Sequence, residues 1–231
     1  MHSHPRAHLV YAVSGVMRIE AGTSSYIVPP STALFLPAHA EHSISMDGPV
    51  AMRTIFLREE AATRIGNSAM VIGVSPLLRE LIVAACAEPL EWDLAGRGYH
   101  LAELALDEIA RSTALSLSLP MPTDARLRRV VTAIRANPHD RRGLEEWAEV
   151  ANASSRTLAR LFRTETGLSF RQWRQQARLT EALSALTTGQ SPARAAAIAG
   201  FDSQPAFGAA FRKLFGITPG QARALQKASE H

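Results

Sequence analysis

Short apolar runs alternate with turn residues over the first quarter of the chain. Residues 8–57 contain four runs rich in Val, Ile, Leu, Phe and Tyr, and each is followed within a few positions by Gly, Pro or Thr. Apolar runs of this kind, bounded by turn residues, are typical of strands. The predicted strands are residues 9–13, 16–20, 26–28 and 33–36. Their spacing indicates an antiparallel barrel or sandwich.

From Glu59 onward the apolar residues recur at helical spacing. The helical pattern covers residues 76–86, 98–111 and, after a linker at 116–122, residues 124–231. The fold class predicted is therefore α+β with two domains, the first β-rich and the second all-α. The predicted boundaries are 1–58 for the β-rich part, 59–122 for a helical connector with its linker, and 123–231 for the all-α domain.

Two helix-turn-helix motifs are predicted in the all-α domain, at residues 144–165 and 191–215. Ser154 is a natural N-cap for the second helix of the first motif. Residues 169–188 form one predicted helix between the motifs, about 30 Å long. Successive major grooves on one DNA face lie about 34 Å apart. Two recognition helices at the ends of this helix are therefore spaced to read neighbouring turns of one duplex.

The second helix of the first motif carries three arginines on the side opposite its apolar stripe. The candidate DNA-contacting residues on that face are Ser155, Arg156, Ala159, Arg160 and Arg163. A planar guanidinium group bonds guanine or clamps phosphate through two N–H groups at once, which suits a helix in the major groove. An exposed basic face of an ordinary helical bundle would show the same residues, so this segment alone leaves both interpretations open.

The second motif offers fewer polar groups on its recognition helix. Its candidates are Ser203, Gln204, Arg212 and Lys213, whereas residues 205–209 are Pro, Ala, Phe, Gly and Ala. Arg212 and Lys213 lie toward the helix end, where contacts with phosphate or solvent are expected. We therefore expect Arg156 and Arg160 of the first motif to supply most base discrimination. The second motif is expected to position the protein on the DNA backbone.

Charge is divided unevenly between the two halves. Residues 1–123 carry 8 basic and 12 acidic side chains, and residues 124–231 carry 17 and 9. This asymmetry indicates a polyanion-binding domain joined to a domain of another kind. No apolar run approaches the roughly 20 residues of a membrane-spanning helix, and the first residues do not read as a secretory signal. With its single cysteine, the chain is expected to work in the cytoplasm.

The last hundred residues contain a long ordered set of motifs. They include Ser-Ser-Arg-Thr-Leu-Ala-Arg-Leu-Phe at 154–162, Ile-Ala-Gly-Phe-Asp-Ser-Gln at 198–204 and Phe-Gly-Ile-Thr-Pro at 215–219. In these motifs the chain resembles the AraC/XylS family of bacterial transcription regulators. The resemblance implies a sequence-specific regulator, more commonly an activator, that binds double-stranded operator or promoter DNA and works with RNA polymerase. It implies a regulator rather than an enzyme, with no catalytic residues.

Histidines gather near the N-terminus and again near residue 40. His2, His4, His8 and His42 match the ligand positions of the cupin barrel, with His8 standing where Glu or Gln is usual. Residues 10–17 and 28–37 also resemble the sensor domains of one subgroup of this regulator family. The resemblance implies a cupin-like sensor at residues 1–58. Its ligand would be a divalent metal, Zn, Ni, Fe or Cu, which imidazole suits, or a small-molecule effector.

Alternatives to a metal-binding sensor remain open at this point. A cupin normally has a strand before its His-x-His motif, which this chain lacks; an upstream translation start would explain this. His2 and His4 also lie at a terminus, where chains often fray. A cupin enzyme would need an acid or base beside its metal, and Glu41 is the obvious carboxylate. A first domain with a purely structural or dimerising role is the third alternative. Exposed leucines on the two connector helices indicate a homodimer.

Overall fold

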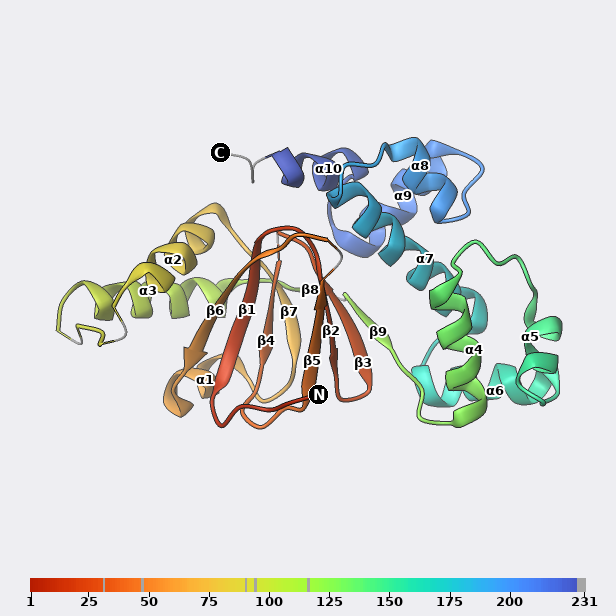
Figure 1. Ribbon diagram of the computed structural model, residues 1–231, viewed down its shortest axis with the longest axis horizontal. Coiled ribbons are helices and arrows are strands. Elements are labelled where there is room, and N and C mark those ends of the chain that lie inside the picture. The colour runs from red at the N-terminus through yellow and green to blue at the C-terminus, as the bar shows by residue number, and fades with distance from the viewer. Residues whose placement is uncertain (31, 47, 90, 94, 116, 228–231) are drawn as a thin grey trace. The chain divides into compact units, whose positions relative to one another are not determined.

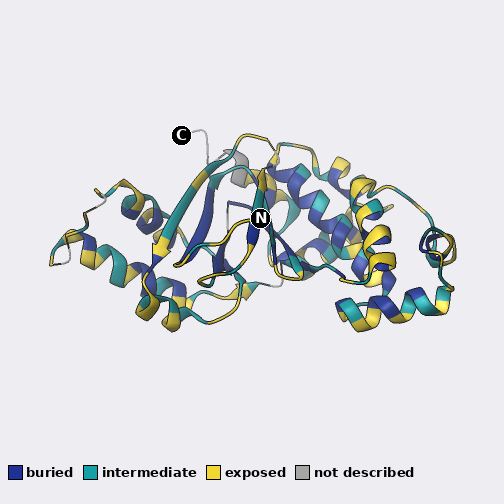
Figure 2. Ribbon diagram, turned by 60° about the horizontal axis from the view of Figure 1, so that its bottom comes forward, coloured by how far each residue is buried: buried dark blue, intermediate teal, exposed yellow. Residues whose placement is uncertain are grey.

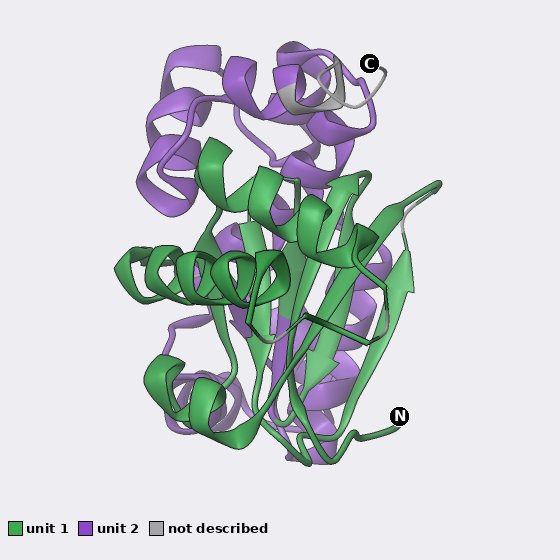
Figure 3. Ribbon diagram, turned by 90° about the vertical axis from the view of Figure 1, so that its left-hand side faces the viewer, with its two compact units in different colours: residues 1–22, 26–117, 225–231 green, residues 23–25, 118–224 purple. Residues whose placement is uncertain are grey.

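The computed structural model describes residues 1–30, 32–46, 48–89, 91–93, 95–115 and 117–227. The chain divides into two compact units (Figure 3). The first contains Met1–Gly22, Tyr26–Leu117 and the C-terminal residues from Leu225, and the second contains Thr23–Ser25 and Ser118–Ala224. Ser116 of the expected linker, and the last four residues of the expected DNA-binding domain, lie outside the described residues.

A five-stranded antiparallel sheet runs through the first unit (Figure 1), with the strand order β6-β1-β4-β7-β8. Its strands are β1 (Ala7–Ser14), β4 (Thr32–Leu36), β6 (Ala51–Leu57), β7 (Met70–Gly73) and β8 (Ala114–Leu115). In this sheet His8 pairs with Leu36 on one side and with Phe56 on the other. The ladder therefore fixes the position of His8 at the start of β1.

A second sheet has the strand order β5-β2-β3-β9. Its strands are β2 (Met17–Ala21), β3 (Ser24–Val28), β5 (His42–Met46) and β9 (Ser118–Pro120). The antiparallel pairing of β2 with β5 places Ala21 opposite His42. No ladder among the described strands joins the edges of the two sheets, so of the barrel and the sandwich that the pattern left open, the structure has a pair of sheets.

Both faces of the five-stranded sheet are covered. The helices of this unit are α1 (Glu59–Ile65), α2 (Pro76–Ala87) and α3 (Arg97–Arg111). Leu9, Tyr11 and Phe35 pack in one core with buried residues of α2 and α3. Val10 is also fully buried, although it points to the opposite face. His8 shares the face of Val10, and therefore points away from the helices.

The second unit is helical after β9. Its helices are α4 (Ala125–Ala136), α5 (Leu144–Val150), α6 (Ser155–Thr166), α7 (Phe170–Thr187), α8 (Pro192–Ile198), α9 (Gln204–Phe215) and α10 (Pro219–Lys227). Trp147, Phe162 and Trp173 are fully buried in the core that α4, α5, α6 and the start of α7 share. Figure 2 shows that these helices bury one side and expose the other, as amphipathic helices do.

Most of the predicted helices and strands are present near their expected positions. Both helix-turn-helix pairs are observed, as α5–α6 and α8–α9, and α7 connects them. The hydrophobic pattern did not indicate β7, β8 or β9, which lie in the stretch expected to be helical or linker. These strands are two to four residues long, too short for an alternating pattern, and tertiary pairing makes them strands. No helix in the described part of the chain is long and apolar enough to cross a membrane.

Candidate DNA interface and a histidine cluster

Residues at both ends fix the bounds of α6. Ser154 Oγ accepts a hydrogen bond from the Thr157 backbone N–H at 3.1 Å, which satisfies a donor that a helix leaves unpaired at its start. Gly167 ends the helix in the left-handed conformation, with φ 71°, and its N–H donates to the Arg163 carbonyl. The buried stripe of the helix consists of Leu158, Leu161, Phe162 and Thr166. This stripe determines which side of α6 faces solvent.

The arginines predicted to reach DNA lie on the exposed side of α6. Arg156, Arg160 and Arg163 are exposed, and their side chains form no hydrogen bond or ion pair within the described part of the chain. Glu165, the acidic residue of this helix, is engaged elsewhere, because its Oε2 accepts from the N–H and the hydroxyl of Thr123 at 2.8 and 2.9 Å. These hydrogen bonds lower the pKa of Glu165. The face therefore keeps an uncompensated positive charge.

The turn between α5 and α6 docks the two helices against each other. The Ala153 N–H donates to the Ala148 carbonyl at 3.0 Å, and Asn152 takes a φ of 50°, which asparagine adopts more readily than most residues. Trp147 of α5 is fully buried, with the Arg142 guanidinium 3.9 Å from its ring centre. The pair thus has the arrangement in which a recognition helix enters a major groove.

The second recognition helix, α9, presents a different surface. Ser203 caps it, with its Oγ accepting from the Ala206 N–H at 3.4 Å. Its buried stripe consists of Phe207, Phe211 and Phe215. The exposed residues of its first two turns are Gln204, Pro205, Ala206 and Ala209, and Arg212 and Lys213 are exposed in its last turn. The first two turns of α9 therefore present one side-chain amide and no charge.

Four histidine side chains gather beside the starts of β1 and β5. The backbones of His2 and His42 exchange two hydrogen bonds of 2.9 Å, and the His39 N–H donates to the His4 carbonyl at 2.8 Å. The N-terminal segment is thereby paired with the residues that lead into β5. These backbone hydrogen bonds hold His2 and His4 beside the start of β5.

The four imidazole rings form a compact cluster. Ring nitrogens of His2, His4 and His42 lie within 4.8 Å of one another. The ring centre of His8 is 4.9 Å from that of His42 and 5.0 Å from that of His4. His8 is 2% exposed and His42 is fully buried. Glu41, considered as a catalytic carboxylate, is exposed and does not belong to this group. The cluster thus combines only nitrogen donors.

The hydrogen bonds of His42 define its tautomer. Its Nδ1 lies 2.9 Å from the Ala40 carbonyl oxygen, which can only accept, so Nδ1 carries the proton. In the neutral ring Nε2 then carries the lone pair, and it is buried with no hydrogen-bond partner among the described residues. Nδ1 of His8 is likewise buried and unpartnered. Burial, together with the neighbouring His42 and His4 rings, lowers the pKa of His8 to about 4, so this ring is neutral at pH 7.

Comparison with known proteins identifies the family. A family model described as an AraC-like ligand binding domain matches residues 1–148, more than half of the chain. A second model, described as a helix-turn-helix domain, matches residues 147–224. This chain belongs to the AraC family of transcriptional regulators. As an AraC-family protein it is a sequence-specific DNA-binding regulator and not an enzyme.

Two relatives match most of this chain, and one solved structure matches less than half of it. The HTH-type transcriptional regulator NimR of Escherichia coli (strain K12) is 32% identical over 221 residues, which are 96% of this chain and 81% of NimR. The HTH-type transcriptional regulator RipA of Corynebacterium glutamicum is 28% identical over 213 residues, 92% of this chain and 60% of RipA. A crystal structure of an AraC-type regulator from Chromobacterium violaceum is 29% identical, with a TM-score of 0.42, over 44% of this chain and 91% of that chain.

One set of polar residues in this AraC-family protein was missed by sequence reasoning. Arg171, Arg174, Gln175 and Arg178 of α7 line a pocket of about 410 Å³ in the second unit. Their spacing of three and four residues places them on neighbouring turns of one helix face. That spacing was visible in the sequence, but the opposite wall of the pocket, residues 199–203 and Ala206, was not.

Proposed function

We propose that this regulator discriminates bases mainly through α6 of its first motif, and that the second motif positions the protein on the DNA backbone. The observation that carries this division is the contrast between the two recognition helices. The exposed side of α6 presents Arg156, Arg160 and Arg163, whose side chains have no partner among the residues that the structure describes. The first two turns of α9 present Gln204 among Pro and Ala residues. Base edges are read by hydrogen bonds, for which α9 has few donors or acceptors.

Fluorescence anisotropy tests sequence-specific binding directly. The full chain is titrated onto a fragment from beside its own gene and onto a shuffled fragment of the same composition, across a salt series. We expect tighter binding to the native fragment at every salt concentration, because both fragments share the phosphate contribution and only the native one supplies the base contacts. Equal affinities with the same salt dependence would contradict the proposal, since a basic surface alone produces that result.

The proposal extends to the partners of the regulator. DNA-bound regulators of this kind would recruit RNA polymerase as activators, in the cytoplasm of a bacterial cell. The chain would act as a homodimer through the connector helices, where Leu77 of α2 and Tyr99 and Leu104 of α3 are 44–48% exposed. Sedimentation at micromolar concentration tests the homodimer, and a monomer there contradicts it.

We also infer that the ligand controlling this regulator is a divalent metal ion, and that the histidine cluster binds it. Buried nitrogens without partners cost free energy that a metal ion would recover. The His42 tautomer, with Nδ1 donating to a backbone carbonyl and Nε2 directed elsewhere, is the one found in metal-ligating histidines. An all-imidazole set suits Zn, Ni, Fe or Cu and is unsuited to Mg or Ca. Such a metal would tie the segment carrying His2 and His4 to β1 and β5.

His4→Ala is expected to weaken binding of Zn or Ni by about 100-fold or more. One of four ligands would supply roughly a quarter of the 10–16 kcal/mol that is typical of structural zinc, or about 2.5–4 kcal/mol. His4 is only partly buried, so the variant should fold. Calorimetric titration of the chelator-treated full chain with each metal measures the affinity directly.

His100→Ala is the matched control, because His100 is an exposed histidine of the same unit, outside the cluster. The control and the wild type should each bind one metal per chain with equal affinity. If His4→Ala binds as tightly as this control, the cluster is not the metal site. If no metal binds the wild type, an organic effector becomes the candidate ligand of this domain.

A further inference from the structure

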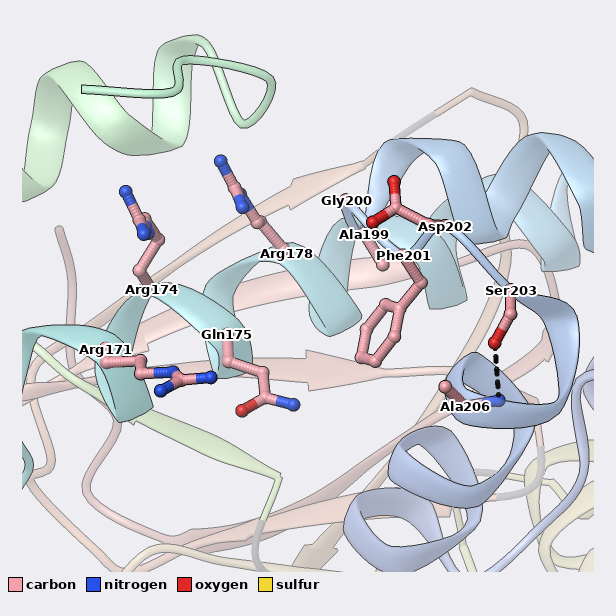
Figure 4. Close-up of a pocket in the computed structure, with 10 residues that line it drawn as sticks. All are labelled: Arg171, Arg174, Gln175, Arg178, Ala199, Gly200, Phe201, Asp202, Ser203 and Ala206. Carbon is pink, nitrogen blue, oxygen red and sulfur yellow. Dashed lines mark hydrogen bonds between the residues drawn. The ribbon is translucent and has the colours of Figure 1, made fainter. Parts of the chain in front are cut away.

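An arginine-rich pocket lies in the second unit between α7 and the turn from α8 to α9 (Figure 4). One wall consists of Arg171, Arg174, Gln175 and Arg178, and the other of residues 199–203 and Ala206. Three arginines face a single carboxylate, that of Asp202, which is exposed and forms no ion pair within the described residues. The pocket is therefore strongly cationic.

Two of the arginines are held in place by backbone carbonyls. Arg174 Nη1 donates to the Arg142 carbonyl at 2.7 Å. Arg178 donates from Nε to the Pro138 carbonyl and from Nη2 to the Asp140 carbonyl, both at 2.7 Å. A carbonyl group orients a guanidinium but carries no net charge. These contacts therefore fix the two cations without neutralising them.

Burial and neighbouring positive charges outweigh the nearby Asp140 carboxylate in the environment of these two guanidinium groups. Burial lowers the pKa of Arg174, and the charge of Arg171 lowers it further. Burial also lowers the pKa of Arg178, with Arg174 as the next contributor. The Asp140 carboxylate is already paired with Arg142, at 2.6 Å. An anion entering the pocket would offset the cost of this partly buried positive charge.

Arg171 and Gln175 are the free donors of the pocket. They lie one helical turn apart on α7, both are exposed, and neither side chain has a partner within the described residues. Across from them lies the start of α9, where Ser203 caps the helix. Figure 4 shows Arg171 and Gln175 beneath Arg174 and Arg178, on the side toward Ala206. The Arg171 guanidinium, the Gln175 amide and the start of α9 therefore all border the same pocket.

We propose that this pocket binds a phosphodiester of the DNA backbone between the two major grooves that the recognition helices enter. The inference rests on the proposed function. Ser203 and Ala206 of the pocket wall flank Gln204, so DNA that reaches the reading end of α9 also reaches the pocket. The 18 residues of α7 span about 27 Å, and the strands between adjacent grooves pass along this length. The pocket would add a backbone contact beside the start of α9, whose first two turns carry no charged side chain.

Arg171→Ala tests the proposal by salt dependence, in the anisotropy assay on native and shuffled fragments. One lost phosphate contact makes the slope of log K against log salt shallower by about 0.9. Between 50 and 200 mM salt, the wild type should then lose about threefold more affinity than the variant. The ratio of native to shuffled affinity should stay at the wild-type value, because phosphates carry no base identity.

Two further variants make the test specific. Arg128→Ala removes one exposed arginine from α4, outside the pocket, and should leave the salt slope unchanged. Gln175→Glu keeps the side-chain size but places a carboxylate beside the phosphate, and should weaken binding to both fragments. A wild-type slope for Arg171→Ala overturns the proposal. A changed native-to-shuffled ratio also overturns it, because the pocket would then read bases.

A free anion is the other possible occupant, and inorganic phosphate serves as its probe. The DNA assignment would be overturned in favour of a small anionic ligand by two results together. Phosphate would raise the melting temperature of the wild type but not of Arg171→Ala, and the Arg171→Ala substitution would leave DNA binding unchanged. Failure of the pocket is also distinguishable from failure of the proposed function. If the wild type does not prefer the native fragment, the proposed function is wrong. The salt dependence of DNA binding by Arg171→Ala tests only the pocket.

Discussion

Replacing Arg160 with alanine is expected to lower affinity for the native DNA fragment by about 5- to 150-fold, corresponding to the 1–3 kcal/mol of a bidentate arginine–guanine contact. Arg160 is exposed near the middle of α6 and has no intramolecular partner within the described residues. Its neighbour Leu161 is buried in the core, so the backbone of α6 is fixed and the side chain points outward. Affinity for the shuffled fragment should fall only by the contribution of one lost positive charge.

The preference for native over shuffled DNA is the deciding quantity for Arg160, and anisotropy on both fragments measures it. Arg212→Ala is the matched control, because Arg212 is also exposed but lies in the last turn of α9. It should weaken binding to both fragments equally. If Ala206→Ser or Ala209→Ser changes the preference more than Arg160→Ala does, base discrimination lies in the second motif and our division of roles is wrong.

Phe162→Ala is expected to lower the free energy of unfolding of the second unit by about 3–5 kcal/mol, the usual cost of truncating a buried phenylalanine. Phe162 is fully buried, and its ring centre lies 5.4 Å from that of Phe170 and 6.0 Å from that of Trp173. It belongs to the stripe that holds α6 in place. Its loss should therefore weaken binding to native and shuffled DNA together, because α6 and its arginines are no longer fixed.

Chemical denaturation followed by tryptophan fluorescence measures this change, since Trp147 and Trp173 lie in the same core as Phe162. Phe162→Leu is the control, because it keeps most of the apolar volume and should cost less than about 1.5 kcal/mol. Equal stabilities for Phe162→Ala and the wild type would show that this core does not hold the motif together.

The local chemistry of the sequence determined the helix-turn-helix motifs almost completely. Apolar residues recur every three or four positions along α6, Ser154 caps its start and Gly167 ends it. Each of these signals depends only on residues a few positions away in the sequence. Because a recognition helix is exposed on one side, its DNA-facing residues follow from the same periodicity. Arg156, Arg160 and Arg163 could be placed on the solvent side of α6 without any knowledge of the rest of the fold.

Contacts between residues far apart in the sequence could not be predicted from such local signals. The strands β7, β8 and β9 are too short to carry a pattern, and form only because a partner strand lies beside them. The four histidines could be matched to a known pattern by resemblance, but their convergence depends on β1, β5 and the backbone pairing of His2 with His42.

The arginine pocket shows the same division between sequence and structure. The seven-residue spacing of Arg171 and Arg178 is compatible with one side of the predicted helix, but nothing in the sequence marked them as a site. Only the packing of the second motif against that helix set Ser203 opposite them. Periodicity and capping depend on neighbouring residues, and so the sequence by itself determined the helices and the exposed arginines of α6. The histidine cluster and the pocket join residues far apart in the chain, so only the tertiary structure decided them.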